Sequence, residues 1–463
     1  MIFSTFRCAL ASLTLGLGAL SVAAGPAKGA DAAVSFAKDV YPILKQHCAG
    51  CHHPGKAKGQ LDLSTFATLK KGGKKSTGFV AGDPAASLLV KMIKGPEPEM
   101  PEDADPLKPE QVAIIEAWVK QGAIDDTPPG GLNGPRIPEK LPVYRSAPPV
   151  TDLKFSPDGS ILAVTGYHEV LLYKPDGSEL IARLLGGSPR LESLAFSDDN
   201  KVLAVAGGSP AQWGEIQVWD LATKKQAKSF RVGFDSLYGV SFSPDHTLVA
   251  FGSADKTARI LKVEDGAEVL FFNNHSDWVF GTTFTIDGKR VLTGSRDMAM
   301  KLSEIATKRF IDDVNNPLDT VSDMARHPKQ DMVVYGGKLG TVRIYKISDN
   351  QNRTAARNDT NLVRLFERQS GAVLAVAYAP EGDSIAVGGE QSEVRLYKTA
   401  DGARLATLPG HSGAVYAVVY RPDGKAIATA GFDGIVRIFE LPKGNLIKEF
   451  PAVPLTDSKT VAK

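Results

Sequence analysis

Two cysteines and a histidine lie close together near the N-terminus and could hold an iron cofactor covalently. Within His47-Cys48-Ala49-Gly50-Cys51-His52-His53, the residues Cys48, Cys51 and His52 form the pattern Cys-x-x-Cys-His, which is typical of c-type haem attachment. Two thiols one helical turn apart can add to the vinyl groups on one edge of the porphyrin. His52, the next residue, then lies beneath the iron and can serve as the proximal ligand. These residues predict one covalently bound haem c.

Two other uses of the cysteines stay open. The chain has three cysteines, and Cys8 lies in the apolar N-terminal segment, so no further cysteine accompanies Cys48 and Cys51. A structural zinc site needs four ligands, and the neighbouring histidines are too close in sequence to complete a good tetrahedron with both thiols. A redox-active Cys-x-x-Cys pair is expected in a βαβ pattern, whereas the pattern here is helical. The residues favour haem over both alternatives.

The second iron ligand is expected to be a methionine, and the N-terminal module contains Met92 and Met100. Met100 lies in Pro98-Glu99-Met100-Pro101, an extended stretch without a helix face for an apolar side chain to join, so Met100 is the expected distal ligand. Met92 lies in Ser87–Ile93, which indicates a buried helix, and its expected role is core packing. Ligation by Met92, or an open or histidine-ligated iron, remains an alternative. Methionine ligation would raise the reduction potential and favour electron transfer.

Two helices are expected to position this site. The first carries residues at helical spacing and would deliver the cysteines at its C-terminal end, with the stripe Phe36, Val40, Ile43, Leu44 and His47. The second begins near Pro109 and ends at Gly122. Its apolar stripe consists of Val112, Ile115, Trp118 and Val119. Two terminal helices crossing beside a cofactor predict a small all-α module.

The C-terminal part of the chain repeats itself with a period of roughly 43 residues. Seven similar strand-and-turn segments begin at Val150, Arg190, Ser236, Trp278, Thr320, Ala372 and Ala414. Each unit continues with three more short apolar runs separated by turn residues, which is the signature of strands. A period of this length is that of one four-stranded propeller blade. The sequence therefore predicts an all-β, seven-bladed propeller over residues 150–450.

This repeating region resembles WD40-repeat proteins. The marks of the resemblance are Trp219-Asp220, Gly410-His411 and the turn aspartates Asp255, Asp297 and Asp433. Only one unit has the Trp-Asp pair, and Phe439 stands where the last unit would carry tryptophan. The polar network that WD40 blades build from His, Ser/Thr, Asp and Trp is therefore expected to be incomplete.

The segment from Phe36 to Ala123 is similar to the short cytochrome c domain of planctomycete proteins. The matching pieces are VYPILKQHCAGCH, Gly59–Leu63, Gly82–Leu88, Glu99–Pro101 and Gln111–Ala123. The resemblance implies haem binding and a pairing with propeller domains in exported proteins, but no defined substrate. Lys108 departs from the family, which tends to place a helix-capping serine there.

The N-terminus indicates export, because a weakly positive start precedes the apolar stretch Leu10–Val22. The protein is therefore expected in the periplasm or another exported location, and an uncleaved signal would tether it to the membrane. No other apolar run is long enough to span a bilayer. The expected divisions are a signal peptide at 1–30, the haem module at 34–125, a Pro/Gly-rich linker at 126–149, the propeller at 150–450 and a tail at 451–463.

The charge pattern limits the partners. A formal net charge of +2 lacks the basic excess of a nucleic-acid-binding protein. Between Lys38 and Lys94, ten lysines face three aspartates. The densest cluster, Lys70, Lys71, Lys74 and Lys75, is either a solvated loop or a docking patch for an acidic redox partner.

These features favour an electron carrier, not an enzyme, whose propeller docks other exported proteins. Two alternatives remain, a propeller oxidoreductase that passes electrons from a substrate to the haem, and a haem-based redox sensor. The propeller histidines are scattered and mostly in turns, which speaks against a catalytic propeller. Insertions at Ser209–Glu215, with Trp213, and at Asp349–Arg364 are expected to be long loops, where binding residues often gather.

Overall fold

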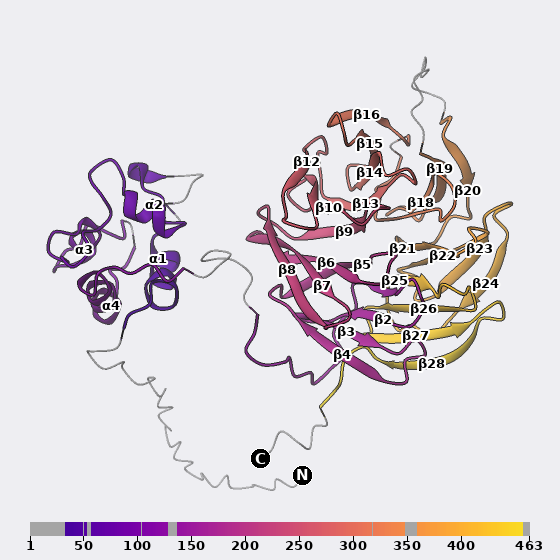
Figure 1. Ribbon diagram of the computed structural model, residues 1–463, viewed down its shortest axis with the longest axis horizontal. Coiled ribbons are helices and arrows are strands. Elements are labelled where there is room, and N and C mark those ends of the chain that lie inside the picture. The colour runs from indigo at the N-terminus through magenta and orange to yellow at the C-terminus, as the bar shows by residue number, and fades with distance from the viewer. Residues whose placement is uncertain are drawn as a thin grey trace, which may run out of the picture. The chain divides into compact units, whose positions relative to one another are not determined.

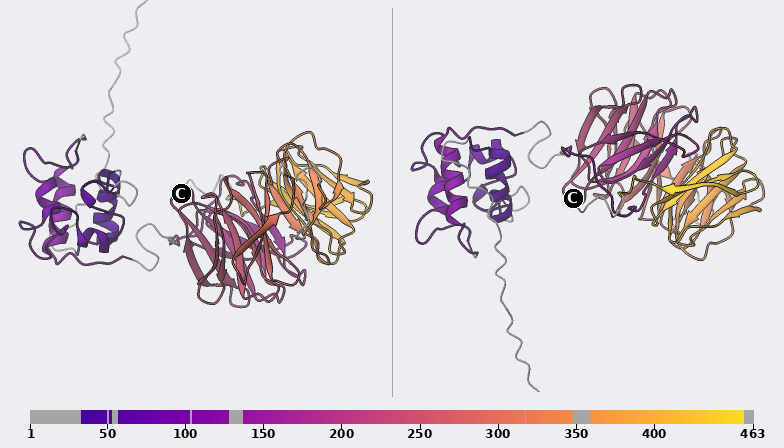
Figure 2. Two further views of the ribbon diagram at one scale, coloured as in Figure 1. Left: turned by 90° about the horizontal axis from the view of Figure 1, so that it is seen from above. Right: turned by 90° about the horizontal axis from the view of Figure 1, so that it is seen from below.

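The computed structural model of the chain describes residues 33–49, 51–52, 57–102, 104–127, 137–316, 318–347 and 359–456. Two compact units, residues 1–132 and 133–463, divide the chain. The first unit is helical and the second is built of sheets (Figures 1 and 2). The predicted signal peptide, part of the linker and the end of the tail lie outside the described residues. In the described part of the chain, no helix combines the length and apolarity needed to cross a bilayer.

In the described residues, the helical unit contains four short α-helices, one π-helical turn and one 3₁₀ turn. A π-helical turn, Phe36–Val40, runs directly into α1 (Tyr41–His47), so the predicted first helix is confirmed with a wider first turn. The other elements are a 3₁₀ turn at Lys58–Gln60, α2 (Phe66–Lys71), α3 (Leu88–Ile93) and α4 (Pro109–Lys120). Pro109 stands in the first turn of α4, where a missing N–H leaves no hydrogen bond unmade.

Trp118 is the centre of the helical unit's core. Its indole is fully buried and lies 5.1 Å from the ring of Phe36 and 5.0 Å from the ring of Phe79, measured between centroids. Its Nε1 donates a hydrogen bond to the carbonyl of Ile124 (3.1 Å). The Ala37 N–H donates to Asp126 Oδ1 (2.8 Å). The first residue of the predicted linker is therefore fixed to the helical unit.

The second unit consists of seven four-stranded antiparallel sheets, and each sheet is made of strands consecutive in sequence. The first two blades are β1 (Leu153–Phe155), β2 (Leu162–Thr165), β3 (Glu169–Tyr173) and β4 (Leu180–Leu185), then β5 (Arg190–Phe196), β6 (Val202–Ser209), β7 (Trp213–Asp220) and β8 (Lys225–Val232). The third to fifth blades are β9 (Leu237–Phe242), β10 (Leu248–Ser253), β11 (Ala258–Lys262) and β12 (Glu268–Phe272), then β13 (Val279–Phe284), β14 (Arg290–Ser295), β15 (Met300–Glu304) and β16 (Arg309–Asp313), then β17 (Asp323–Arg326), β18 (Met332–Gly336), β19 (Val342–Lys346) and β20 (Leu362–Leu365). The last two blades are β21 (Val373–Tyr378), β22 (Ser384–Gly389), β23 (Val394–Lys398) and β24 (Arg404–Leu408), then β25 (Val415–Tyr420), β26 (Ala426–Gly431), β27 (Ile435–Glu440) and β28 (Asn445–Pro451).

The predicted seven-bladed propeller is confirmed. The first strand of each blade lies toward the middle of the ring and the fourth strand lies at its rim (Figure 1). The ring closes where the last blade meets the first: the Val150 N–H donates to the carbonyl of Gly431 (2.9 Å). Tyr144 pairs with Leu455 in a parallel bridge, so the first residues of the predicted tail belong to the closure.

The chain enters the propeller through a buried ion pair. The Tyr144 hydroxyl donates to Glu169 Oε1 (2.7 Å), and Arg183 donates to both oxygens of the same carboxylate at 2.7 and 2.6 Å. Arg183 also donates to the carbonyl of Pro142 (2.8 Å). The Glu169 side chain is completely buried. The last part of the predicted linker is therefore packed onto the first blade.

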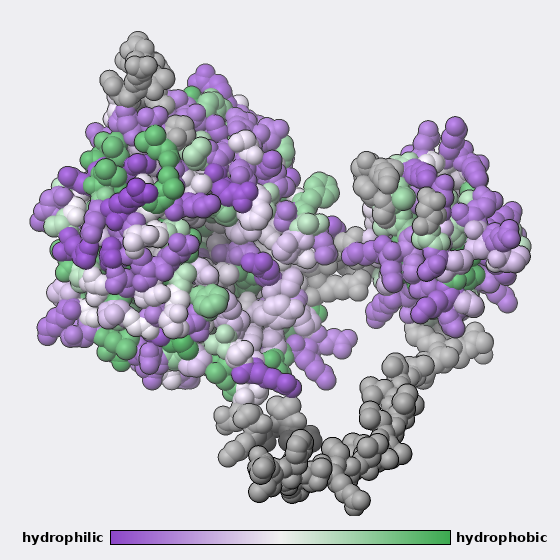
Figure 3. All heavy atoms as spheres, turned by 180° about the vertical axis from the view of Figure 1, so that it is seen from behind, coloured by the Kyte–Doolittle hydropathy of each residue, from purple (hydrophilic) through white to green (hydrophobic). Residues whose placement is uncertain are grey.

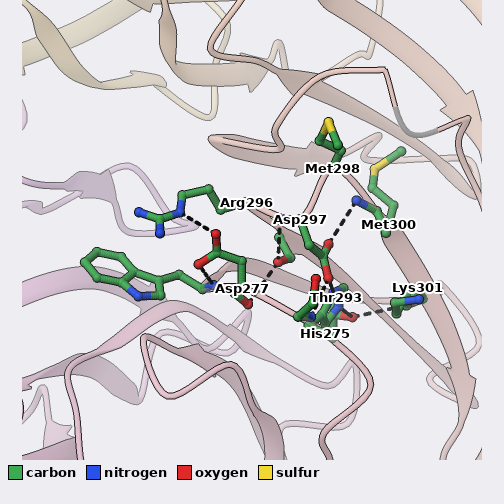
Figure 4. A network of polar contacts seen from close by, with 12 residues as sticks. His275, Asp277, Thr293, Arg296, Asp297, Met298, Met300 and Lys301 are labelled. Carbon is green, nitrogen blue, oxygen red and sulfur yellow. Dashed lines mark hydrogen bonds and ion pairs between the residues drawn. The ribbon is translucent and has the colours of Figure 1, made fainter.

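Two blades contain a polar network around a buried histidine. The sequence predicted that such networks would lack some of their members. In the fourth blade, His275 Nδ1 lies 2.9 Å from Asp297 Oδ2, and its Nε2 lies 2.8 Å from the Thr293 hydroxyl (Figure 4). Burial opposes ionisation of Asp297, but the hydrogen bond and charge of His275, together with the N–H groups of Ser276 and Ala299, outweigh it and lower the pKa of Asp297 to about 2. Tryptophan is absent from this network, as the sequence indicated.

In the seventh blade, the Nδ1 atom of the network histidine accepts a hydrogen bond instead of donating one. His411 Nε2 lies 2.8 Å from the Thr429 hydroxyl, while its Nδ1 faces the guanidinium of Arg437 at 2.9 Å. A guanidinium only donates, so His411 Nδ1 accepts, whereas His275 Nδ1 donates to a carboxylate. Burial and the Arg437 charge lower the pKa of His411. Both histidines lie in loops outside the strands, and each has an aspartate near Nδ1, Asp297 at 2.9 Å from His275 and Asp433 at 3.5 Å from His411.

The insertion at Ser209–Glu215 is not a long loop. It lengthens β6 and β7 into a paired hairpin, because Ser209 lies opposite Trp213 in the register. The Trp213 side chain is buried, as a packing residue would be. Of the second insertion, residues 349–358 lie outside the described residues, and Leu362–Leu365 forms β20. The face of the propeller drawn in Figure 3 shows several separate apolar patches among hydrophilic side chains.

Candidate haem site

The helical unit contains a cavity of about 290 Å³ that gathers the predicted site residues. Cys48, Cys51 and His52 line it together with Met92 and Met100, which follow His52 by 40 and 48 residues. Much of the remaining wall is apolar and consists of Leu61, Leu63, Leu69, Leu88, Leu89 and Ile93. The volume lies near the lower end of the range of about 300–1,000 Å³ that small-molecule sites occupy.

A tight turn at the end of α1 presents the two cysteines. The N–H groups of Cys51 and His52 both donate to the carbonyl of Cys48, at 3.2 and 3.1 Å. This turn places the two cysteines on the same side of the backbone. Neither thiol takes part in a disulfide. Burial raises the pKa of the Cys48 thiol to about 11, which disfavours the thiolate that disulfide exchange requires.

A hydrogen bond from one ring nitrogen orients His52. Its Nδ1 lies 2.9 Å from the backbone carbonyl of Lys58. Because a carbonyl only accepts, Nδ1 must carry the proton, so the lone pair of Nε2 remains available to a metal. A carbonyl partner of this kind is the usual support of a metal-binding histidine. The backbone of His52 is also held in place, because the Leu63 N–H donates a hydrogen bond to its carbonyl (3.0 Å).

Both methionines of the module lie at the cavity wall. Met100 is half-buried and packs against the hydrophobic core of the unit. Its N–H donates to the carbonyl of Met92 (2.8 Å), which fixes the extended segment beside α3. Met92 was expected to pack in the core, but Val90 and Ile93 are the buried residues of α3. Met92 is half-buried and lines the cavity, so side-chain position does not exclude it as a ligand.

His47 and the start of α4 are joined through one glutamine. Lys108 provides no side-chain cap, and Gln111 Oε1 accepts from the Lys108 N–H instead (3.1 Å). The side-chain nitrogen of Gln111 lies 3.2 Å from His47 Nε2. This contact connects α4 to α1 directly beside the cysteines, and sequence reasoning missed it. Glutamine three residues after the helix start was the available signal.

Charged side chains surround one part of the cavity. Lys58, Lys74 and Lys75 line it together with Glu102. Lys58 Nζ lies 2.5 Å from Glu102 Oε2, and both side chains are about half exposed. The hydrogen bond and charge of Lys58 lower the pKa of Glu102. Two lysines of the predicted docking cluster, Lys74 and Lys75, are therefore residues of the cavity as well.

The residues present fit a c-type haem. Two thiols, a histidine with a proton on Nδ1 and two thioethers form the donor set at a largely apolar cavity. The backbone is closely packed on the side of Gly78, where a Cβ would lie 2.1 Å from the carbonyl oxygen of Leu69. Over the described residues, no group of three or more His, Cys, Asp or Glu side chains is arranged to hold a metal ion.

The fold and the cavity together define a protein that joins a small cytochrome c-like domain to a seven-bladed WD40-type propeller. Residues 48–103 match the family described as Planctomycete cytochrome C. Residues 225–261 and 266–302 match the WD domain, G-beta repeat, and residues 376–456 match the Anaphase-promoting complex subunit 4 WD40 domain. The resemblances drawn from the sequence motifs are thus confirmed.

Curated relatives share only part of their length with this chain. The U3 small nucleolar RNA-associated protein 15 homolog of Xenopus tropicalis is 23% identical over 271 residues, or 52% of either chain. Protein tipD of Dictyostelium discoideum is 29% identical over 123 residues, covering 27% of this chain and 19% of its own. Periodic tryptophan protein 2 of Saccharomyces cerevisiae is 22% identical over 291 residues, covering 47% and 31%. The chain therefore spans about half of the first relative and less of the other two.

Proposed function

We propose that the protein is an exported c-type cytochrome that carries electrons, with a propeller that docks it to other proteins. The observation that carries this proposal is the cavity, which brings both thiols, His52 and two methionines together. Cys48 and Cys51 would bind haem through thioethers, His52 Nε2 would be the proximal ligand and Met100 the distal ligand. When bound, haem supplies one-electron exchange between ferrous and ferric iron.

The protein's own residues would set the conditions for this exchange. The hydrogen bond from His52 Nδ1 to the Lys58 carbonyl fixes the ring and its tautomer. The leucine-rich wall excludes water from one side of the site. Lys74 and Lys75 would neutralise the two carboxylates that haem carries, and the neighbouring Lys70 and Lys71 would attract an acidic redox partner.

The experiment is expression with periplasmic cytochrome maturation, followed by a haemochrome spectrum and a redox titration. Wild-type protein should carry one covalent haem with a low-spin spectrum. Met100→Leu should lower the reduction potential and abolish the methionine-to-iron charge-transfer band, while the matched Met92→Leu should change neither. Absence of covalent haem would refute the cofactor. The opposite result for the two methionine variants would assign the ligand to Met92.

Export is supported by the N-terminal pattern and by the requirement that this type of haem attachment takes place outside the cytoplasm. The mass of the mature protein tests it, since cleavage is expected after Ala24, Ala27 or Ala30. A protein that retains Met1 and stays with the membrane would indicate an uncleaved anchor. A full-length cytoplasmic protein without haem would contradict export.

A further inference from the structure

One residue near the start of each innermost strand occupies the same position in the repeat. Aligning the seven innermost strands on their buried residues gives one partly exposed position per blade: Thr151, Glu192, Tyr238, Phe280, Ser322, Leu374 and Tyr416. The innermost strands surround the axis of the propeller, so these equivalent positions form a ring of residues around it. This ring contains one carboxylate and three aromatic rings, and it contains no basic residue.

The next level along the innermost strands is also acidic. Lys154 lies 3.1 Å from Asp152. Burial disfavours the Lys154 charge, but Asp152 and Asp323 outweigh that effect and raise the pKa of Lys154. Asp323 lies on β17 in the fifth blade, so charges from distant blades interact across the axis. Counting Glu192 and its partner Arg190, three carboxylates stand against two basic groups here, which leaves a negative balance that favours a positively charged ligand.

Three aromatic rings from two neighbouring blades pack together next to Glu192. Tyr238 and Trp278 lie 6.2 Å apart with nearly parallel rings. Phe280 packs edge-on against both, at 5.5 and 6.0 Å. The Arg296 guanidinium, held by Asp277 at 2.8 Å (Figure 4), lies 4.7 Å from the centre of the Trp278 ring. The cluster therefore already accepts a cation on one ring face, as aromatic faces do.

Glu192 is a buried carboxylate with an unsatisfied oxygen. Its side chain is 7% exposed, and Oε1 has no hydrogen-bond partner. Arg190 Nε approaches Oε1 to 3.1 Å without hydrogen-bond geometry, and the Arg190 side chain is 58% exposed. A register shift between Leu191 and Ser193 places Glu192 in a β-bulge, a device that re-aims a side chain. A buried, unsatisfied carboxylate is costly unless a cation pairs with it.

Glu192 and Tyr238 interact electrostatically. Burial raises the pKa of Glu192 despite the nearby Arg190. Burial together with the Glu192 charge raises the pKa of Tyr238 to about 12. The strands that carry the two residues are joined by a hydrogen bond from the Val240 N–H to the Ser193 hydroxyl (2.7 Å). The carboxylate and the aromatic cluster thus form a single site.

We propose that Glu192, Tyr238, Trp278 and Phe280 bind a cationic side chain, an arginine or a lysine, presented by a partner polypeptide. The carboxylate would pair with the charge while the aromatic faces contact the cation and its apolar stem. Arg190 would be displaced from Glu192 on binding. The inference deepens the docking role proposed for the propeller and does not depend on haem.

A polypeptide is favoured over a free small cation because apolar side chains surround the same face. The loops between second and third strands and the loops between blades emerge on one face, since successive strands alternate in direction. These loops carry large, exposed apolar residues from several blades: Tyr167, Phe234, Met298, Leu318, Leu339 and Phe432. Residues flanking the bound cation could contact them, which a small amine could not do.

The test measures binding of short peptides to the full-length, haem-loaded protein by calorimetry. The probe is a peptide with one central arginine flanked by leucines, and its neutral control replaces arginine with citrulline. The lysine peptide and free ethylguanidine are the further arms. The arginine or lysine peptide should bind at least about tenfold more tightly than the citrulline peptide, corresponding to about 1.4 kcal/mol. Equal binding of charged and neutral peptides would overturn the proposal, and so would equal binding of ethylguanidine and the peptides.

Two variants with opposite expected effects keep the proposal testable even if one of them folds poorly. Glu192→Gln should weaken binding of the cationic peptide about tenfold, whereas Arg190→Gln should strengthen it because a competing cation is removed. Glu264→Gln, at an exposed acid between β11 and β12, should leave binding unchanged. Weaker binding in Arg190→Gln, or unchanged binding in a folded Glu192→Gln, would refute the site. An unaltered haem spectrum in these variants separates this outcome from failure of the cytochrome proposal.

Discussion

The two units of the protein fill their interiors in different ways. In the helical unit, a packed aromatic cluster lies beside a cavity of about 290 Å³. In the propeller, each hydrophobic cluster joins neighbouring blades, as where Leu172 of the first blade packs with Leu194 and Leu203 of the second. Small domains bury a smaller fraction of their surface than large ones. We therefore expect the helical unit to depend on a bound group for its stability, and the propeller to depend on its own repeats.

The largest expected effect is loss of the helical unit's stability when its thiols are removed. Cys48→Ala/Cys51→Ala should abolish covalent haem and remove the unit's cooperative thermal transition, because a ligand stabilises only the folded state that binds it. The propeller transition should stay where it is. Calorimetry combined with haem absorbance measures both events. A helical transition that survives unchanged without haem would contradict the dependence.

The buried ion pair at the entry to the propeller should be the most sensitive point of the second unit. Arg183→Met leaves the completely buried Glu169 carboxylate without its cation and should cost about 3–5 kcal/mol. Denaturant unfolding followed by circular dichroism measures this cost. The control is Arg296→Met, whose ion pair with Asp277 is more exposed and should contribute less than about 1 kcal/mol. Similar losses from both variants would show that burial does not set the energies of these pairs.

A smaller, pH-dependent effect is expected in the fourth blade. The carboxyl of Asp297 has a folded-state pKa of about 2, below its ordinary value, so its stabilisation is present above about pH 4 and lost as pH falls toward 2. Asp297→Asn should therefore lower the free energy of unfolding by about 2 kcal/mol at neutral pH, using about 1.4 kcal/mol per pKa unit. The difference should shrink below pH 4. A difference that is constant from pH 7 to pH 3 would contradict the pKa assignment.

The sequence predicted the fold almost completely because both of its signals are local. Alternation and turn residues recur in all seven units, and the stripe from Phe36 to His47 defines the first helix. The His411 network could be expected from Gly410-His411, but its fourth-blade counterpart follows Asn274, so the motif was not visible there. The insertion at Ser209–Glu215 was predicted to be a loop, but it extends the paired strands β6 and β7. The length of an insertion does not show whether its residues pair as strands.

The site was predictable where spacing determines it and not where tertiary packing does. Cys48, Cys51 and His52 follow from the spacing of one turn. The position of Met92 depends on which face of α3 meets the cavity, and α3 is only six residues long. The ring around Glu192 depends on blades that are far apart in sequence. The repeat relates its members, but which of them touch, as Tyr238 and Phe280 do, follows only from the packing of neighbouring blades.

The smallest expected effect separates two pairs of lysines that the sequence grouped together. Lys74 and Lys75 line the cavity, whereas Lys70 and Lys71 end α2 and do not. Positive charge near haem stabilises the reduced form, so Lys74→Gln/Lys75→Gln should lower the reduction potential by an amount on the order of tens of millivolts. Redox titration at low ionic strength measures the shift.

The matched variant Lys70→Gln/Lys71→Gln removes the same charge and should leave the potential nearly unchanged. Both variants should reduce the salt dependence of electron transfer with an acidic partner, because long-range attraction depends on the total charge of the surface. Equal shifts in reduction potential from the two pairs would mean that all four lysines influence the haem equally. Cavity contact would then have no separate influence on the haem.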